Sequence, residues 1–402
     1  MLKERLFGVT GHQGNHGEDV KELYYYLDST PSHSYMKFLY KYPQRKYPYE
    51  ELVTENVHRD RNVAEYEILD SEVFEDDRYW DVFMEVRVFC SRSGSLSLNH
   101  ILQYAKDEDD PNSLYVRITG YNRGPEPATL HIIPQLWFRN TWSWPAVKPP
   151  IPSLAGSVTE NDIQYIRIRH PAMERYFMYC LPSPPPVDAE GIFVTDEDVV
   201  IQPELIFTEN DTNFGRLYGG HNISPYVKDA FHDHIIPCHR PGSESNNSIS
   251  AGGDHEGALH AHQSESLPFT SQQSPFVNPD KRGTKSAAHY IFQNVPGNGG
   301  CAVVRIRLTP QSASKVVNLE DEGAFDGVIE ERREEADEFY NSLVFGPMSD
   351  DLKQIMRQAL GGMLWTKQYY HFVQKEWIEG DPAQPPPPPG RKHIRNKVCL
   401  LN

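Results

Sequence analysis

The 402-residue chain lacks the marks of several large protein classes. Its five cysteines lie far apart and no two share a CxxC spacing, so neither a disulfide framework nor a structural zinc site is predicted, and a reducing compartment is expected. No stretch approaches the roughly 18 apolar residues of a membrane span. The first residues, MLKERLFGVTGHQGNHGEDV, also lack the apolar core of a secretory signal. These absences favour a cytosolic protein without a membrane partner.

Positive charge is scarce as well. Lysine and arginine number 39 against 56 aspartates and glutamates, which gives a formal net charge of -17, and no dense Lys/Arg stripe offsets it locally. Such a surface repels phosphate backbones, so nucleic acid is not an expected partner. The P-loop, GxGxxG and GxSxG motifs do not occur, and no cofactor is expected.

Two histidine pairs are the strongest metal-binding candidates. They are His232-Asp233-His234 and His260-Ala261-His262, in which an extended backbone would place both imidazoles on one side, as zinc or copper ligands require. No spacing supplies a third ligand to either pair. The sequence therefore predicts no metal site.

Aromatic residues, proline and glycine are abundant and favour β structure. The chain has 22 Tyr, 18 Phe, 32 Pro and 27 Gly, and short runs alternate apolar with polar residues, as half-buried strands do. Because no helical periodicity intervenes, we expect an antiparallel sandwich rather than βαβ units. The alternating runs are 82–89, 114–122, 130–138, 163–170, 175–180 and 302–308.

These patterns predict four parts. Residues 1–65 are expected to pack on a β-sandwich of residues 66–327, which carries a Ser-, Gly- and His-rich insert at 237–278 that has too few aliphatic residues to order. Helices are expected over 328–378: one from Val328 to Leu343 and one capped by Ser349 that runs to about Trp377. Residues 379–402 form a proline-rich tail.

Five segments, in this order, resemble glycoside hydrolase family 63 and its mannosylglycerate-hydrolase-like glucosidases. They are KERLFG (3–8), GNHGEDVKELYYYLDSTPSHSYMKFLYKYPQ (14–44), QLWFRNTWSW (135–144), FTENDTN (207–213) and EGDPAQPPPP (379–388). The resemblance implies an antiparallel β super-sandwich that packs on an (α/α)6 barrel, with sugar bound at the mouth of the barrel. It covers the N-terminal portion of the family pattern.

The segment QLWFRNTWSW holds three of the six tryptophans and is the candidate sugar-binding element. Aromatic faces stack on pyranose rings, while arginine and asparagine make directional hydrogen bonds to hydroxyl groups. The candidate substrate-binding residues are Arg139, Asn140, Trp142 and Trp144. The alternative, that this aromatic cluster is core or interdomain packing, stays open.

The residues for hydrolysis are absent from the predicted parts. Inverting glycosidases use two carboxyl groups, and the resemblance implies that both come from the barrel. Residues 328–402 are far fewer than the roughly 200 that twelve helices and their loops require, and the final KVCLLN departs from the family pattern, so we expect a truncated chain. Asp81 belongs to a sandwich strand, and the adjacent Glu18 and Asp19 would point to different sides. No catalytic residue is predicted.

Three functions are compatible with these features. The first is the N-terminal, non-catalytic part of a family-63-like, inverting α-glucosidase-type hydrolase, inactive as this chain, whose intramolecular partner in full-length relatives is the barrel. The second is a non-catalytic carbohydrate-binding or interaction module. The third is a scaffold that needs a partner to cover the face otherwise buried against the barrel.

Overall fold

The computed structural model of the chain describes residues 23–60, 62–64, 66–88, 112–142, 149–196, 199–236, 276–316, 319, 321–367, 374–380 and 385–393. Several predictions fall outside these residues. They concern KERLFG, Glu18 and Asp19, Trp144, the histidine pair at 260–262 and nearly all of the insert at 237–278.

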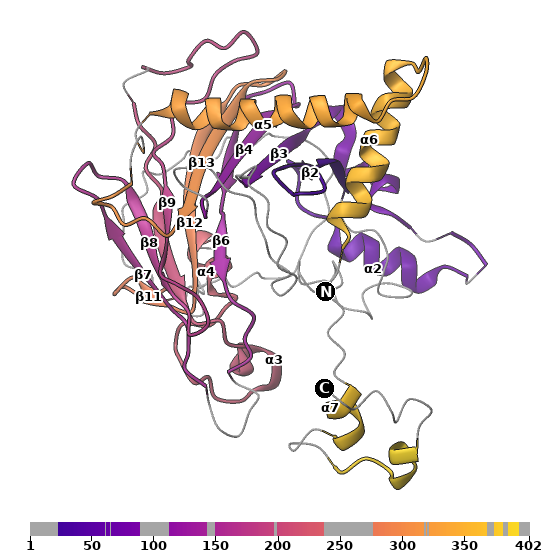
Figure 1. Ribbon diagram of the computed structural model, residues 1–402, viewed down its shortest axis with the longest axis vertical. Coiled ribbons are helices and arrows are strands. Elements are labelled where there is room, and N and C mark those ends of the chain that lie inside the picture. The colour runs from indigo at the N-terminus through magenta and orange to yellow at the C-terminus, as the bar shows by residue number, and fades with distance from the viewer. Residues whose placement is uncertain are drawn as a thin grey trace, which may run out of the picture.

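A nine-stranded antiparallel sheet dominates the fold (Figure 1). Its strand order is β1-β2-β3-β4-β13-β9-β8-β7-β11. The bounds are β1 Leu23–Ser29, β2 Tyr35–Pro43, β3 Tyr79–Val88, β4 Leu114–Asn122, β7 Ser153–Val158, β8 Gln164–Arg169, β9 Tyr176–Cys180, β11 Arg282–Gly283 and β13 Cys301–Thr309.

A smaller sheet packs on the large one. It has the order β10-β12-β5, with β6 also paired to β12, and its bounds are β5 Ala128–Ile132, β6 Gln135–Trp137, β10 Glu204–Thr208 and β12 Lys285–Val295. One buried cluster joins the two sheets, and Ile166 of β8, Phe207 of β10 and Tyr290 of β12 are each fully covered within it. The predicted mainly β, antiparallel fold with a short helical segment after it is therefore confirmed.

The six predicted strands correspond to β3, β4, β5 with β6, β8, β9 and β13, whereas the other described strands were not predicted. The run at 130–138 contains two strands, β5 and β6, separated by Ile133 and Pro134. Proline has no backbone N–H to donate to a ladder; its carbonyl instead accepts a hydrogen bond from the Ala288 N–H at 3.0 Å. Asp81 lies inside β3, as predicted, and is buried in ion pairs with Lys41 and Arg123.

The described part of the segment 1–65 includes two strands of the large sheet. Residues 23–43 form β1 and β2, which extend this sheet beyond β3. The alternation of β1 is hidden in the sequence, because Tyr24, Tyr25 and Tyr26 follow one another. A short helix, α2 (Tyr49–His58), and two 3-10 turns, η2 (Ile68–Asp70) and η3 (Glu72–Asp77), follow.

Helix α5 (Glu322–Ser342) lies across the strands of the large sheet at the top of Figure 1. It starts six residues before the predicted Val328, because the Asp321 side chain caps it by accepting from the Ala324 N–H at 2.9 Å. Its apolar side is buried against the sheet through Phe325, Ile329, Ala336 and Tyr340.

Helix α6 (Asp350–Trp365) descends beside β1. Its predicted cap is confirmed, since Ser349 Oγ accepts from the Leu352 N–H at 3.3 Å. The helix ends at Trp365 rather than near Trp377, and the Thr366 hydroxyl donates to the Gly362 carbonyl there at 2.9 Å. A separate helix, α7 (Gln374–Glu379), and the 3-10 turn η5 (Pro389–His393) lie apart from the sheets (Figure 1). Among the described helices, none is long and apolar enough to cross a lipid bilayer.

Candidate functional site

Two segments that carry the family resemblance meet beside the edge of the large sheet. The Asn140 side-chain amide donates to the Asn210 carbonyl at 3.0 Å and to Asp211 Oδ1 at 3.1 Å. In return, the Asn210 side-chain amide donates to the Phe138 carbonyl at 2.8 Å. QLWFRNTWSW and FTENDTN are thus held side by side although about seventy positions separate them in the sequence.

Strand β11 brings a third segment to the same place. The Thr284 hydroxyl, just after β11, donates to Glu209 Oε2 at 2.7 Å and accepts from the Asn210 N–H at 2.7 Å. Gly283 allows this approach, because a Cβ at that position would lie 2.2 Å from the Thr208 carbonyl oxygen. A side chain larger than hydrogen at position 283 would therefore push β11 away from β10.

A cavity of about 690 Å³ opens where these segments meet. This volume lies within the range of small-molecule sites, roughly 300 to 1,000 Å³. Trp142 lines it and is itself only 6% exposed. The charged side chains of the lining are Arg167 and Arg169 of β8, Arg282 of β11, and Glu209 and Asp211 of the loop after β10.

The alternation of side chains along β8 places two of the arginines on the cavity side of the sheet. Ile166 and Ile168 of β8 point into the core, so Arg167 and Arg169 project from the opposite face of the sheet. No ion pair joins Arg167, Arg169 or Arg282 to an acidic residue in the described part of the chain. The cavity therefore combines an indole ring, three guanidinium groups and two carboxylates.

The four predicted sugar-binding residues differ in where they lie relative to the cavity. Asn140 is half-buried and joins the two segments, and Trp142 lines the cavity. Arg139 is exposed and does not line the cavity, while Trp144 lies outside the described residues. Sequence reasoning did not single out the arginines or acids of the cavity. The signals for them were FTENDTN, which contains Glu209 and Asp211, and the outward positions of the 163–170 alternation.

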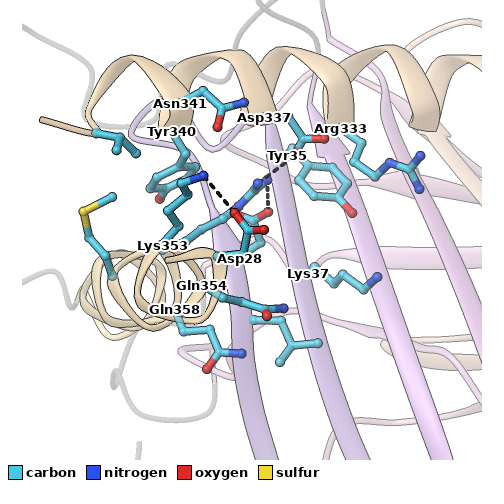
Figure 2. Close-up of a pocket in the computed structure, with 15 residues that line it drawn as sticks. Asp28, Tyr35, Lys37, Arg333, Asp337, Tyr340, Asn341, Lys353, Gln354 and Gln358 are labelled. Carbon is cyan, nitrogen blue, oxygen red and sulfur yellow. Dashed lines mark hydrogen bonds and ion pairs between the residues drawn. The ribbon is translucent and has the colours of Figure 1, made fainter. Parts of the chain in front are cut away.

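A second cavity, of about 370 Å³, lies between the sheet and helices α5 and α6 (Figure 2). Its central charges are paired with one another, since Arg357 of α6 forms ion pairs with Asp28 of β1 and with Asp337 of α5. Tyr340 and Trp365 complete the joint by donating hydrogen bonds to the Ser29 and Asp28 carbonyls, at 2.5 Å and 2.8 Å. We interpret this cavity as a structural joint between the helices and the sheet.

Histidines also gather on the small sheet. His131 Nδ1 and His289 Nε2 lie 2.8 Å apart, and His234 of α4 (Ala230–Ile235) contacts Glu204 at 3.2 Å. The hydrogen bond with His234 and the nearby His289 ring lower the pKa of Glu204 to about 2. His232 and His234 stand on a helix, not on the extended backbone considered for them. Within the described residues, no group of three or more His, Cys, Asp or Glu is arranged to hold a metal ion.

No family model matches the chain. The chain is similar to a Saccharomyces cerevisiae protein described as "Uncharacterized protein YMR196W", with 37% identity over 417 residues. The match covers 98% of this chain and 33% of the yeast protein, so the chain spans about a third of the length of that relative.

Proposed function

We propose that this chain is the N-terminal, non-catalytic part of a glycoside hydrolase related to family 63, of the inverting α-glucosidase type. In this proposal, the cavity beside Trp142 contributes sugar contacts next to a catalytic barrel that longer relatives supply. The observation that carries the proposal is the Asn140–Asp211 contact, because it joins two of the segments that resemble the family at a cavity of suitable size.

The lining of the cavity suits a sugar. Carboxylates accept hydrogen bonds from hydroxyl groups, guanidinium groups donate to them, and an indole packs against the apolar face of a pyranose ring. Glu209, Asp211, Arg282 and Trp142 supply these groups from three different segments. The convergence of such groups in one cavity supports carbohydrate binding.

We propose that the 402-residue chain does not itself hydrolyse glycosides. An inverting enzyme needs one carboxylic acid and one carboxylate on opposite sides of the scissile bond, about 6.5–9.5 Å apart. Asp81 is buried between Lys41 and Arg123, Glu209 accepts from Thr284, and Asp211 accepts from Asn140. These partners favour structural and binding roles for all three acids.

Helix α6 supports the presence of a partner domain in longer relatives. Leu352, Ile355 and Met363 are 53%, 54% and 72% exposed, which leaves an apolar stripe along the side of α6 away from the sheet. Burying such side chains against further helices would be favourable by about 25 cal/mol per Å² of apolar area. The yeast relative has two thirds of its length outside the matched segment, which leaves room for such a domain.

We further propose a cytosolic location. Cys180 is a buried free thiol and Cys301 is a half-buried one. Free thiols are typical of a reducing compartment.

The full-length yeast relative offers the test of the hydrolase proposal. It should release glucose from α-linked glucosides, and replacement of the residue aligned with Asp211 by alanine should lower kcat/KM. Absence of activity on a panel of α-linked disaccharides would contradict the proposal. So would hydrolysis by the purified 402-residue chain that is lost when one of its own acidic residues is changed.

The second candidate is a carbohydrate-binding module that acts without a barrel, and a cavity lined by this chain's own residues favours it. Calorimetric titration of this chain with glucose disaccharides separates the two. Binding that Asp211→Ala abolishes favours the module, whereas no binding favours a segment that acts only beside the barrel. Trp137→Ala is the matched control, because Trp137 is 40% exposed on β6 and does not line the cavity.

A further inference from the structure

We propose that the cavity beside Trp142 binds the anionic group of a phosphorylated sugar, through Arg167, Arg169 and Arg282. The sugar part of this inference rests on the proposed function, whereas the anion part rests on the arginines alone.

The three arginines share one face of the sheet, with Arg167 and Arg169 on β8, Arg282 on β11, and β7 between these two strands. Ala155 of β7 is the register partner of Arg167 on one side and of Arg282 on the other. Ser153, two residues earlier on the same face, is the partner of Arg169. Strands lie about 4.8 Å apart, so Arg167 and Arg282 start roughly 10 Å from each other across the small Ala155 side chain. Long guanidinium side chains at this separation can converge on one phosphate group.

Their charges stand unneutralised in an acidic chain. The formal net charge is -17, and other sheet arginines are paired: Arg117 with Glu85 and Arg305 with Asp326. No comparable ion pair joins the three cavity arginines to acids among the described residues. Like charges that share one face of a sheet repel one another, so an anion between them would relieve repulsion as well as form hydrogen bonds.

Guanidinium groups suit a phosphate better than a neutral sugar. Each can donate two parallel hydrogen bonds to phosphate oxygens, and these charge-assisted bonds are about twice as strong as neutral ones. The acids of the cavity reduce this preference without cancelling it, because three guanidinium groups face two carboxylates in the lining. The arginines come from β8 and β11 and the acids from the loop after β10, so different elements supply groups for phosphate and for hydroxyl groups.

The size and charge of the cavity select a sugar monophosphate over other anions. A volume of about 690 Å³ is much larger than an inorganic phosphate needs. A polyanion such as RNA is disfavoured by the two cavity carboxylates and by the net charge of -17. A hexose phosphate would place its phosphate at the arginines and its hydroxyl groups at Glu209 and Asp211.

Calorimetric titrations with glucose 6-phosphate, inorganic phosphate and glucose test the proposal on the full chain at low ionic strength. We expect glucose 6-phosphate to bind most tightly. Arg167→Gln and Arg282→Gln should each weaken its binding at least tenfold, and added salt should weaken it in the wild type. Arg175→Gln is the matched control, because Arg175 is also exposed, lies just before β9 and does not line the cavity. Thermal unfolding of each variant checks that it is folded.

The remaining outcomes overturn the proposal in distinguishable ways. Equal affinity for inorganic phosphate and glucose 6-phosphate would overturn the assignment to a sugar phosphate. Binding of neutral glucose or glucose disaccharides that the arginine variants leave unchanged would overturn the anion site and retain the proposed carbohydrate function. Failure of all three ligands to bind a folded chain would overturn the inference. The proposed function would still be tested independently by the hydrolase assay on the yeast relative.

Discussion

Asn140 and Asp211 lie 3.1 Å apart, amide nitrogen to carboxylate oxygen, and this contact ties the tryptophan-rich segment to the acidic loop after β10. The same amide also donates to the Asn210 carbonyl. Together with the Asn210 amide, which donates to the Phe138 carbonyl, the Asn140 side chain therefore fixes how these two segments meet beside the candidate cavity.

Removal of this contact should loosen the cavity. Asn140→Ala should lower the free energy of unfolding by about 1–3 kcal/mol, because one hydrogen bond to a charged acceptor and one to a carbonyl are lost. Asn140→Asp should cost more at pH 7, since it places a carboxylate beside Asp211. Its cost should shrink as the pH falls below about 4 and the new carboxyl group takes up a proton. Urea unfolding of both variants at pH 7 and pH 4 checks the order, and equal stability of the two at pH 7 would contradict it.

Gly283 should not tolerate a side chain. Gly283→Ala would place a methyl group 2.2 Å from the Thr208 carbonyl oxygen, a backbone atom that cannot rotate away. We expect a loss of about 1–3 kcal/mol in stability and weaker ligand binding, because Thr284 would shift relative to Glu209. Gly362→Ala on α6 is the control: nothing lies within 4 Å of its added methyl group, and alanine favours a helix. Thermal unfolding should show opposite shifts for the two variants.

The ion pair between Arg305 and Asp326 should make the docking of α5 sensitive to acid. Arg305 donates from Nε and Nη2 to the two oxygens of Asp326, at 3.1 Å and 2.7 Å. Burial alone would raise the pKa of Asp326, but Arg305 and Arg117 outweigh it and hold that pKa below its ordinary value. The stabilisation is therefore present above the unfolded-state pKa, near 4, and is lost as the pH falls through the folded-state pKa.

Asp326→Asn should consequently lower the free energy of unfolding by about 1–3 kcal/mol at neutral pH. Between pH 7 and pH 3, this free energy should fall less in the variant than in the wild type. Chemical unfolding between pH 3 and pH 7 measures both effects. Glu331→Gln on the same helix is the control, because the Glu331 side chain is 58% exposed and its ion pair with Arg332 should contribute little. If the free energy of unfolding of Asp326→Asn falls in acid as steeply as that of the wild type, the Arg305–Asp326 pair does not cause the acid sensitivity.

The joint between α6 and β1 should fail when only one of its charges is removed (Figure 2). Arg357→Met leaves the buried Asp28 carboxylate without its cation and should cost about 3–5 kcal/mol. Adding Asp28→Asn should restore part of the loss, because no uncompensated charge is then buried. A double-mutant cycle by urea unfolding measures the coupling. Strictly additive effects of the two substitutions would mean that Asp28 and Arg357 do not interact.

Much of the sandwich was predictable because its signals are local. Strands β4, β8 and β13 follow from alternation, and the start of α6 follows from Ser349, whose hydroxyl accepts from a backbone N–H only three residues away. Strands β1, β2, β7, β10, β11 and β12 lie outside the predicted alternating runs. In β1, three consecutive tyrosines hide the period of two, although the middle one, Tyr25, is exposed.

The candidate site was predictable only in part. Trp142 and Asn140 stood out by composition, but only Trp142 lines the cavity, while Asn140 joins two segments beside it and Arg139 lies outside it. Asp211 and Arg282 carry no local signal of sharing a cavity, since seventy-one positions separate them in the chain. Their proximity depends on long-range pairing between strands.

The sequence by itself determined the β-rich class, the positions of about half of the described strands and the cap of α6, because these depend on side-chain period and on hydrogen bonds between near neighbours. Only the tertiary structure decided that Arg167, Arg169 and Arg282 lie together. That arrangement exists because β7 pairs with β8 on one side and with the distant β11 on the other. The order of strands in a sheet depends on which distant segments pair and bury their apolar faces together, so it cannot be deduced from any short stretch of sequence.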